Sequence, residues 1–153
     1  MKGIEQEVNN KNKKINNKRY SVLMDSSNKK IINYTIVKKG IKTDNFNKFI
    51  LKLNKMDKEN KNVYFLDIAR VHKTKSFNKI KEDYKLNIIF NALYQSKYNL
   101  IEYIFLSLRK QIQKKSNKTY GELINIINDF NKNIKESTIT NIFNHVMKLF
   151  VQC

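Results

Sequence analysis

The amino-acid sequence predicts a single mixed α/β domain, in which helices pack on a sheet. Short strand-like apolar runs alternate along the chain with longer stretches of helical spacing, in the order hairpin, helix, strand, helix, strand, helix. The length of 153 residues is enough for one domain and too short for two ordinary ones. No linker rich in Pro, Gly or Ser divides the chain.

The first elements are an arm, a hairpin and a helix. Residues 1–18 hold few apolar side chains and are predicted to be a disordered or loosely attached arm. Residues 19–25 and 31–38 alternate as strands do, and the polar stretch between them predicts a turn. Thr43 is a candidate N-cap for the following helix. The apolar residues of that helix recur at i, i+3, i+4 and i+7: Phe46, Phe49, Ile50 and Leu53.

Two further strands and a helix are predicted in the middle of the chain. The nearly continuous apolar runs 62–67 and 86–90 are typical of strands buried on both faces. Residues 73–84 carry Phe77, Ile80 and Tyr84 at helical spacing, so we expect a helix between the two strands.

A loop at 91–99 leads into a helical C-terminal part. Three apolar stripes predict three helices, with stripes that begin at Ile101, Tyr120 and Ile139. We interpret 19–115 as the main α/β part of the domain and 116–153 as a helical C-terminal extension of it.

The net charge of +18 predicts binding to a polyanion, with nucleic acid favoured over an acidic small molecule. The basic side chains are 28 Lys and only three Arg, and the chain also holds 23 Asn. Lys and Asn codons are rich in A, so an AT-rich coding sequence is the alternative explanation of this charge.

Composition also limits the compartment and the kind of site. No stretch approaches the ~20 apolar residues of a membrane span, so no membrane association is expected. Cys153 is the single cysteine, which excludes an internal disulfide and fits a reducing compartment. His72 and His145 are the only histidines, too few with one cysteine for a zinc site. We expect an intracellular protein, nuclear if the source is eukaryotic.

A carboxylate follows the 62–67 strand in the segment "YFLDIARVHKTK". Ligands of open α/β sheets bind outside the carboxyl ends of the strands, which is where Asp67 is predicted to lie. By itself an aspartate in this place is more often a loop cap than a metal ligand. A second carboxylate, Glu102, is separated from Asp67 by 34 residues and lies near the start of the predicted helix after the loop.

Two segments at this separation resemble one family. "LDIARVH" is similar to the "LDNARIH" segment of mariner-like and related insertion-sequence transposases, and "LYQSKYNLIEYIFLSLRKQI" resembles their "PPYSPDLNPIEYVWSKLKRKL" segment. The gap of 34 residues matches the family's spacing between its second and third catalytic acids. The resemblance covers roughly residues 18–152. It implies a ribonuclease-H-like fold, a DDE catalytic site that uses Mg²⁺ or Mn²⁺, and DNA as the partner.

Residue by residue, the resemblance makes Asp67 the second catalytic, metal-binding acid and Glu102 the third. Arg70 and His72 match the Arg and His that follow the second acid, Ser96 matches the serine of a Ser-Pro pair, and Asn99 matches the asparagine before the third acid. Together with Arg109 and Lys110 of the basic run that follows, these four residues are the predicted DNA contacts. Hard divalent cations prefer oxygen ligands, and two such ions suit phosphodiester displacement.

The sequence departs from the family in its first acid. The strand that carries this acid lies upstream of the aligned stretch, so we expect a catalytic domain truncated at the N-terminus, with its first strand missing. The early acids available are Asp25 and, in the arm, Glu5 and Glu7. Ile68 stands in place of the asparagine after the second acid, and the prolines of the catalytic loop are absent.

Three functions stay open at this point. The preferred one is a transposase-derived DNA-binding domain that is incomplete and inactive as this chain. The alternatives are an active metal-dependent DNA endonuclease or transposase, and a non-catalytic basic nucleic-acid-binding or interaction domain. A homodimer is also left open.

Overall fold

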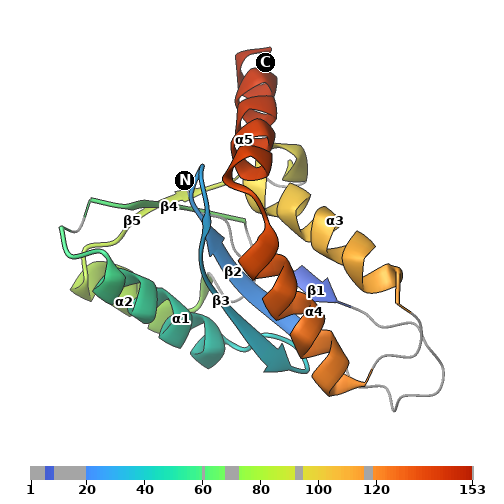
Figure 1. Cartoon of the computed structure of the whole chain (residues 1–153). Coiled ribbons are helices and arrows are strands. Elements are labelled where there is room, and N and C mark those ends of the chain that lie inside the picture. Colours follow the sequence, from blue (N-terminus) through green and yellow to red (C-terminus); the bar gives the residue numbers. More distant parts are fainter. Residues whose placement is uncertain are drawn as a thin grey trace.

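The computed structural model describes residues 6–8, 20–59, 61–67, 73–91, 95–115 and 119–152. The described elements are, in chain order, β1 (Gln6–Val8), β2 (Tyr20–Ser26), β3 (Ile31–Lys38), α1 (Thr43–Met56), β4 (Val63–Leu66), α2 (Lys75–Asp83), β5 (Asn87–Phe90), the 3₁₀ helix η2 (Ser96–Tyr98), α3 (Leu100–Gln113), α4 (Tyr120–Asn133) and α5 (Glu136–Val151). This order of helices and strands confirms the mixed α/β class (Figure 1).

The strands form two hydrogen-bonded ladders. Strands β1, β2 and β3 are antiparallel, in the order β1-β2-β3, and β4 pairs with β5 in parallel. The 19–38 hairpin is therefore confirmed, whereas the expectation that the strand before it is missing is not met. Gln6–Val8 pairs with β2 on the side away from β3, inside the segment that we expected to be a disordered arm. These three residues are too few and too polar for a strand pattern, and the ladder to β2 is what holds them extended.

Strand β2 lies at the centre of the fold, and each of its seven residues is buried. On one face Tyr20, Val22 and Met24 pack in a cluster with α3 and α4, and on the other Leu23 packs in a second cluster with α1, β4 and Phe77 of α2. Figure 1 shows α1 and α2 on one side of the hairpin and α3 and α4 on the other. Burial on both faces explains why β2 alternates so little between apolar and polar residues.

The two helices that flank β2 form because each has one apolar stripe. Helix α1 buries the predicted Phe46, Phe49, Ile50 and Leu53, and α3 buries six side chains: Leu100, Ile101, Ile104, Phe105, Leu108 and Ile112. The predicted cap of α1 is wrong by one residue. Thr43 is the first helical residue, and the side chain of Asn45 accepts a hydrogen bond from the Lys42 backbone N–H (3.0 Å).

The prediction of two fully buried strands holds for β4 after its first residue, Val63, which is 41% exposed, and is wrong for β5. Tyr64, Phe65 and Leu66 of β4 are buried. In β5, Ile89 is 55% exposed and Phe90 38% exposed, because among the described strands β5 pairs only with β4 and lies at an edge. A continuous apolar run predicts a strand, but it does not tell whether a neighbour covers the second face.

The C-terminal helices pack on the same core as α3. Leu123, Ile127 and Ile139 join the cluster that contains the apolar stripe of α3. The outer end of α5 contacts η2, where the ring of Phe150 stacks on Tyr98 with centroids 4.8 Å apart. None of the helices in the described part of the chain is both long and apolar enough to cross a membrane.

Candidate metal and DNA site

Asp67 directly follows β4, and the residue that follows the neighbouring strand β5 contacts its side chain. Asn91, which directly follows β5, donates a hydrogen bond from Nδ2 to Asp67 Oδ1 (3.3 Å). The backbone N–H of Asn91 also donates to the carbonyl oxygen of Leu66 (2.7 Å), which extends the β4–β5 ladder by one residue. The carboxyl ends of the two parallel strands therefore meet at Asp67. This is the edge of an open α/β sheet at which ligands are expected to bind.

Glu102 lies in the first turn of α3. Asn99 caps this helix: its side-chain oxygen accepts from the backbone N–H of Ile101 (3.2 Å), and its own carbonyl accepts from the N–H of Glu102 (3.2 Å). Leu100 and Ile101 of this turn are buried in the cluster that contains Val22 and Met24 of β2, which fixes the start of the helix against the sheet. Glu102 itself is half-buried.

The structure brings Asp67 and Glu102 together. Burial, the charge of Asp67 and a side-chain hydrogen bond between the two carboxyls raise the pKa of Glu102 to about 7, while Arg109 opposes the rise. Two carboxyls in contact form a set of oxygen donors that suits a divalent cation, because the cation relieves the repulsion between their negative charges. That Asp67 and Glu102 bind metal stays a prediction.

A third acid does not join this pair among the described residues, since they hold no group of three or more His, Cys, Asp or Glu side chains arranged for a metal ion. Asp25 is fully buried near Tyr64, in the second position of β4. Burial, then Asp57 and then Asp25 raise the pKa of that tyrosine to about 12. Glu5 lies outside the described residues, as does the side chain of Glu7 in β1.

The predicted DNA contacts are only partly described. Arg70 and His72 lie outside the described residues, and so does the side chain of Ser96, whose backbone belongs to η2. Asn99 is fully buried as the cap of α3, so contact with a phosphate would require that segment to open.

The two basic residues of α3 have different surroundings. Arg109 is half-buried and acts electrostatically on Glu102, which lies two helical turns before it. Lys110 is exposed. The roles of both in DNA binding stay predictions.

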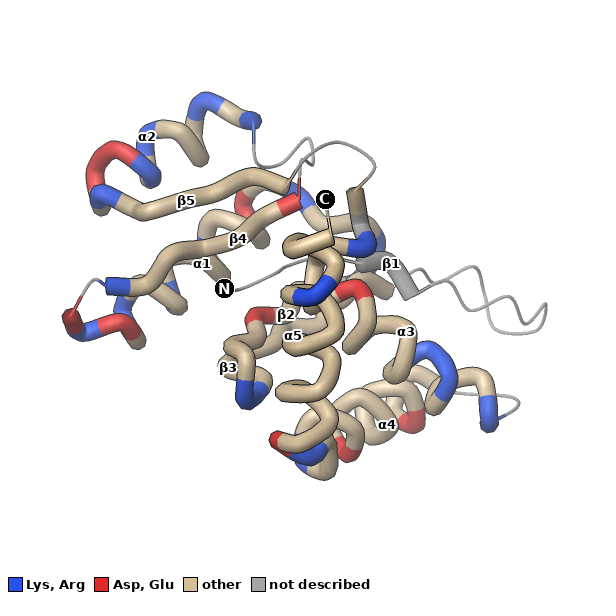
Figure 2. The backbone as a smooth tube through the Cα atoms, turned by 90° about the horizontal axis from the view of Figure 1, so that it is seen from above, with Lys and Arg blue, Asp and Glu red and all other residues tan. Residues whose placement is uncertain are grey.

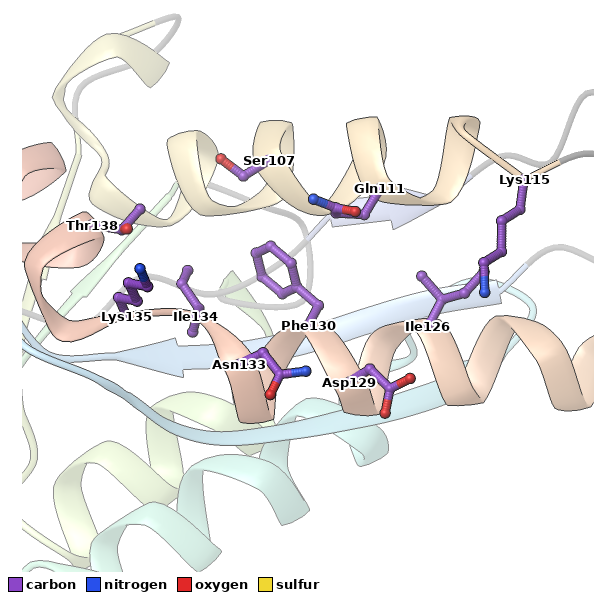
Figure 3. A pocket seen from close by; sticks show the side chains of 10 residues that line it. All are labelled: Ser107, Gln111, Lys115, Ile126, Asp129, Phe130, Asn133, Ile134, Lys135 and Thr138. Carbon is purple, nitrogen blue, oxygen red and sulfur yellow. The ribbon is translucent and has the colours of Figure 1, made fainter.

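A pocket lies on another part of the molecule. A pocket of about 630 Å³ separates α3 from α4 and the start of α5, with Phe130 pointing across it toward Ser107 and Gln111 (Figure 3). Ser107 follows Glu102 by five residues, roughly 140° around the helix, so the pocket and the acid pair are on different faces of α3. Among the described residues, Asp129 is the one acid in its lining, and they form no metal-ligating cluster there.

Sequence reasoning missed Asn91. The side chain is buried and contacts the predicted ligand Asp67, but in the sequence it is one asparagine among 23 and follows no motif. Its position directly after the 86–90 strand, at the same sheet edge as Asp67, is the signal that could have identified it.

A family model described as DDE superfamily endonuclease matches residues 2–124. The chain belongs to this family, which is the family that the sequence resembles. Comparison with curated proteins gives no match.

Solved structures of Mos1 mariner transposase have the same fold. The catalytic domain crystallised alone has a TM-score of 0.75 and 13% sequence identity, with 97% of this chain and 76% of that chain covered. The catalytic domain with Raltegravir and Mn has a TM-score of 0.77 and 12% identity, with coverages of 97% and 76%. The Mos1 strand transfer complex has a TM-score of 0.80 and 13% identity, with coverages of 99% and 52%. The ribonuclease-H-like fold is thereby confirmed.

Proposed function

We propose that this chain is a DNA-binding domain of the DDE transposase type that holds a divalent cation weakly and does not cut DNA by itself. The observation that carries the proposal is the pairing of Asp67 with Glu102, without a third acid among the described residues. Mn and Mg are present in solved structures of the related Mos1 catalytic domain. Each absent carboxylate removes a ligand and one negative charge from the site.

Different parts of the fold position the two carboxylates. Asp67 is held at the sheet edge by Asn91, and Glu102 is presented by the first turn of α3. A bound Mg²⁺ or Mn²⁺ would supply Lewis-acid polarisation of a phosphodiester oxygen. Arg109 partly balances the negative charge of the pair, which otherwise repels the phosphate backbone.

The basic surface is the proposed DNA contact. Residues 119–152 hold three lysines and three acidic side chains, so the whole excess of positive charge lies in residues 1–118. Figure 2 shows this difference: Lys residues recur along α1 and α2, and few charged residues lie on α5. Because lysines contact phosphates without reading bases, binding should tolerate changes of sequence.

The test is incubation of the purified protein with end-labelled duplex DNA and Mn²⁺, followed by separate measurements of binding and cleavage. We expect binding without cleavage. With about six phosphate contacts the affinity should fall roughly a thousandfold between about 50 and 200 mM salt. The variants Asp67→Ala and Glu102→Ala should bind DNA as the wild type does. Cleavage that both substitutions abolish would contradict the proposal, and binding that ignores salt would contradict the basic-surface contact.

One observation favours the alternative of an active endonuclease. Strand β1 carries Glu7, pairs with β2 and contacts α3, the helix that presents Glu102. An arm glutamate could then act as the third ligand. If the wild type cleaves DNA, Glu7→Gln and Glu5→Gln identify this ligand by loss of cleavage with DNA binding retained.

A second copy of the chain is the further partner that we propose, docked on α5. Two copies with a charge of +18 each repel one another. The repulsion is weakest when they meet through residues 119–152, where basic and acidic side chains are equal in number. Met147 and Val151 are 37% and 82% exposed there. Sedimentation equilibrium should detect a dimer, Val151→Lys should weaken it, and Asn78→Lys on α2 should leave it unchanged. A monomer at every concentration would contradict this.

A further inference from the structure

Asn91 connects the two segments that present the acid pair. Its side chain is 6% exposed, and its Nδ2 lies within hydrogen-bond distance of two acceptors: Asp67 Oδ1 (3.3 Å) and the backbone carbonyl of Gln95 (2.8 Å). A carboxylate and a carbonyl only accept, so the amide nitrogen and not the amide oxygen must face them. Both N–H groups of the side chain are thereby used.

The second of these bonds reaches the segment that starts α3. The Gln95 carbonyl also accepts from the backbone N–H of Tyr98 (3.1 Å), the bond that closes η2. Asn99, the next residue, caps the helix of Glu102. A short chain of hydrogen bonds thus leads from the Asp67 carboxylate through Asn91 to the turn that precedes α3. Glu102 lies in the first turn of this helix.

We infer that Asn91 is a positioning residue, which fixes the orientation of Asp67 and its spacing from Glu102. The metal-binding part of this inference rests on the proposed function. The amide suits the place because it donates without adding charge. An aspartate there would put a third negative charge against Asp67 and would lack both donors, and an alanine would leave the Gln95 carbonyl and the carboxylate without this partner.

The first test needs no metal. In ¹⁵N-labelled, metal-free protein, the side-chain NH₂ signals of Asn91 should shift in Asp67→Ala, and those of Asn87, which begins the same strand and is exposed, should not. Asn91 signals that stay where they are in Asp67→Ala would overturn the inference, whatever the site binds.

The second test is Mn²⁺ affinity, measured by the EPR signal of free Mn²⁺. Asn91→Leu keeps the size of the side chain and removes the donors, so the affinity should fall about tenfold to a hundredfold, as it does when outer-shell partners of metal ligands are lost. Asn91→His restores an N–H donor and should recover part of the affinity. Asn87→Leu is the matched control and should bind as the wild type does.

The outcomes separate the two proposals. A wild type that binds no Mn²⁺ contradicts the proposed metal site, and the NMR comparison then decides the role of Asn91. A wild type and an Asn91→Leu variant with equal affinity overturn the positioning role while the metal site stands. Thermal unfolding of each variant shows whether the fold is intact, and a loss of affinity that Asn91→His does not recover in any part, in a folded protein, also counts against the inference.

Discussion

Replacement of either paired carboxyl by its amide should lower Mn²⁺ affinity by at least tenfold, and by roughly a hundredfold if both oxygens of the carboxylate coordinate. Asp67→Asn and Glu102→Gln each replace one carboxyl of the contacting pair by a neutral amide. The shapes of the side chains are kept, so the loss reports charge and donor strength rather than packing. Calorimetric titration with Mn²⁺ at pH 8 measures it.

The matched control is Asp83→Asn, which neutralises an exposed acid at the end of α2. Its net charge equals that of the two site variants, so an effect of overall charge would appear in all three. Equal affinities in the three variants would show that Mn²⁺ binding does not depend on the acid pair.

Glu102→Gln should raise the free energy of unfolding of the metal-free protein at pH 8, by on the order of 1–3 kcal/mol. The folded state binds the Glu102 proton more tightly than the unfolded state, because burial and Asp67 raise its pKa from 4.5 to about 7. The unfolded state therefore binds fewer protons between these two values, and the stability of the wild type falls as the pH rises through this window. The amide variant cannot lose a proton and lacks this fall.

Denaturant unfolding at about pH 4, 6 and 8 gives the comparison. The difference between the variant and the wild type should be small at pH 4 and grow toward pH 8, and saturating Mn²⁺ should reduce it at pH 8 by stabilising the wild type. Glu82→Gln, an exposed site on α2, is the control and should show no such trend. A difference that is constant with pH would mean that burial and contact with Asp67 do not raise the pKa of Glu102.

Periodicity predicted the elements well where burial is one-sided or complete. The stripes of α1 and α3 match the buried residues of the structure, since a helix with one apolar face has few other ways to pack. Strand β1 could not be predicted, because its stability lies in the ladder to β2 and not in Gln6–Val8 themselves. The exposure of Ile89 has a similar cause: whether β5 has a cover depends on its neighbours and not on its own residues.

For the site, the resemblance to the transposase family predicted Asp67 and Glu102 as the metal-binding acids, but not which residues position them. The two residues are separated by 34 others in the sequence, and the structure places them in contact. Asn91 was missed because its role depends on two acceptors that the fold brings within reach of one amide nitrogen. The residues next to Asn91 in the sequence do not indicate these two acceptors.

Anomalous X-ray scattering from crystals of the wild type soaked in Mn²⁺ shows directly whether the acid pair binds the metal. We expect one anomalous peak between the carboxylates of Asp67 and Glu102, with metal–oxygen distances of about 2.0–2.6 Å, and no peak there in Glu102→Gln under the same conditions. A soaked crystal without a peak between these two side chains, or with Mn²⁺ only at other acids, would contradict it.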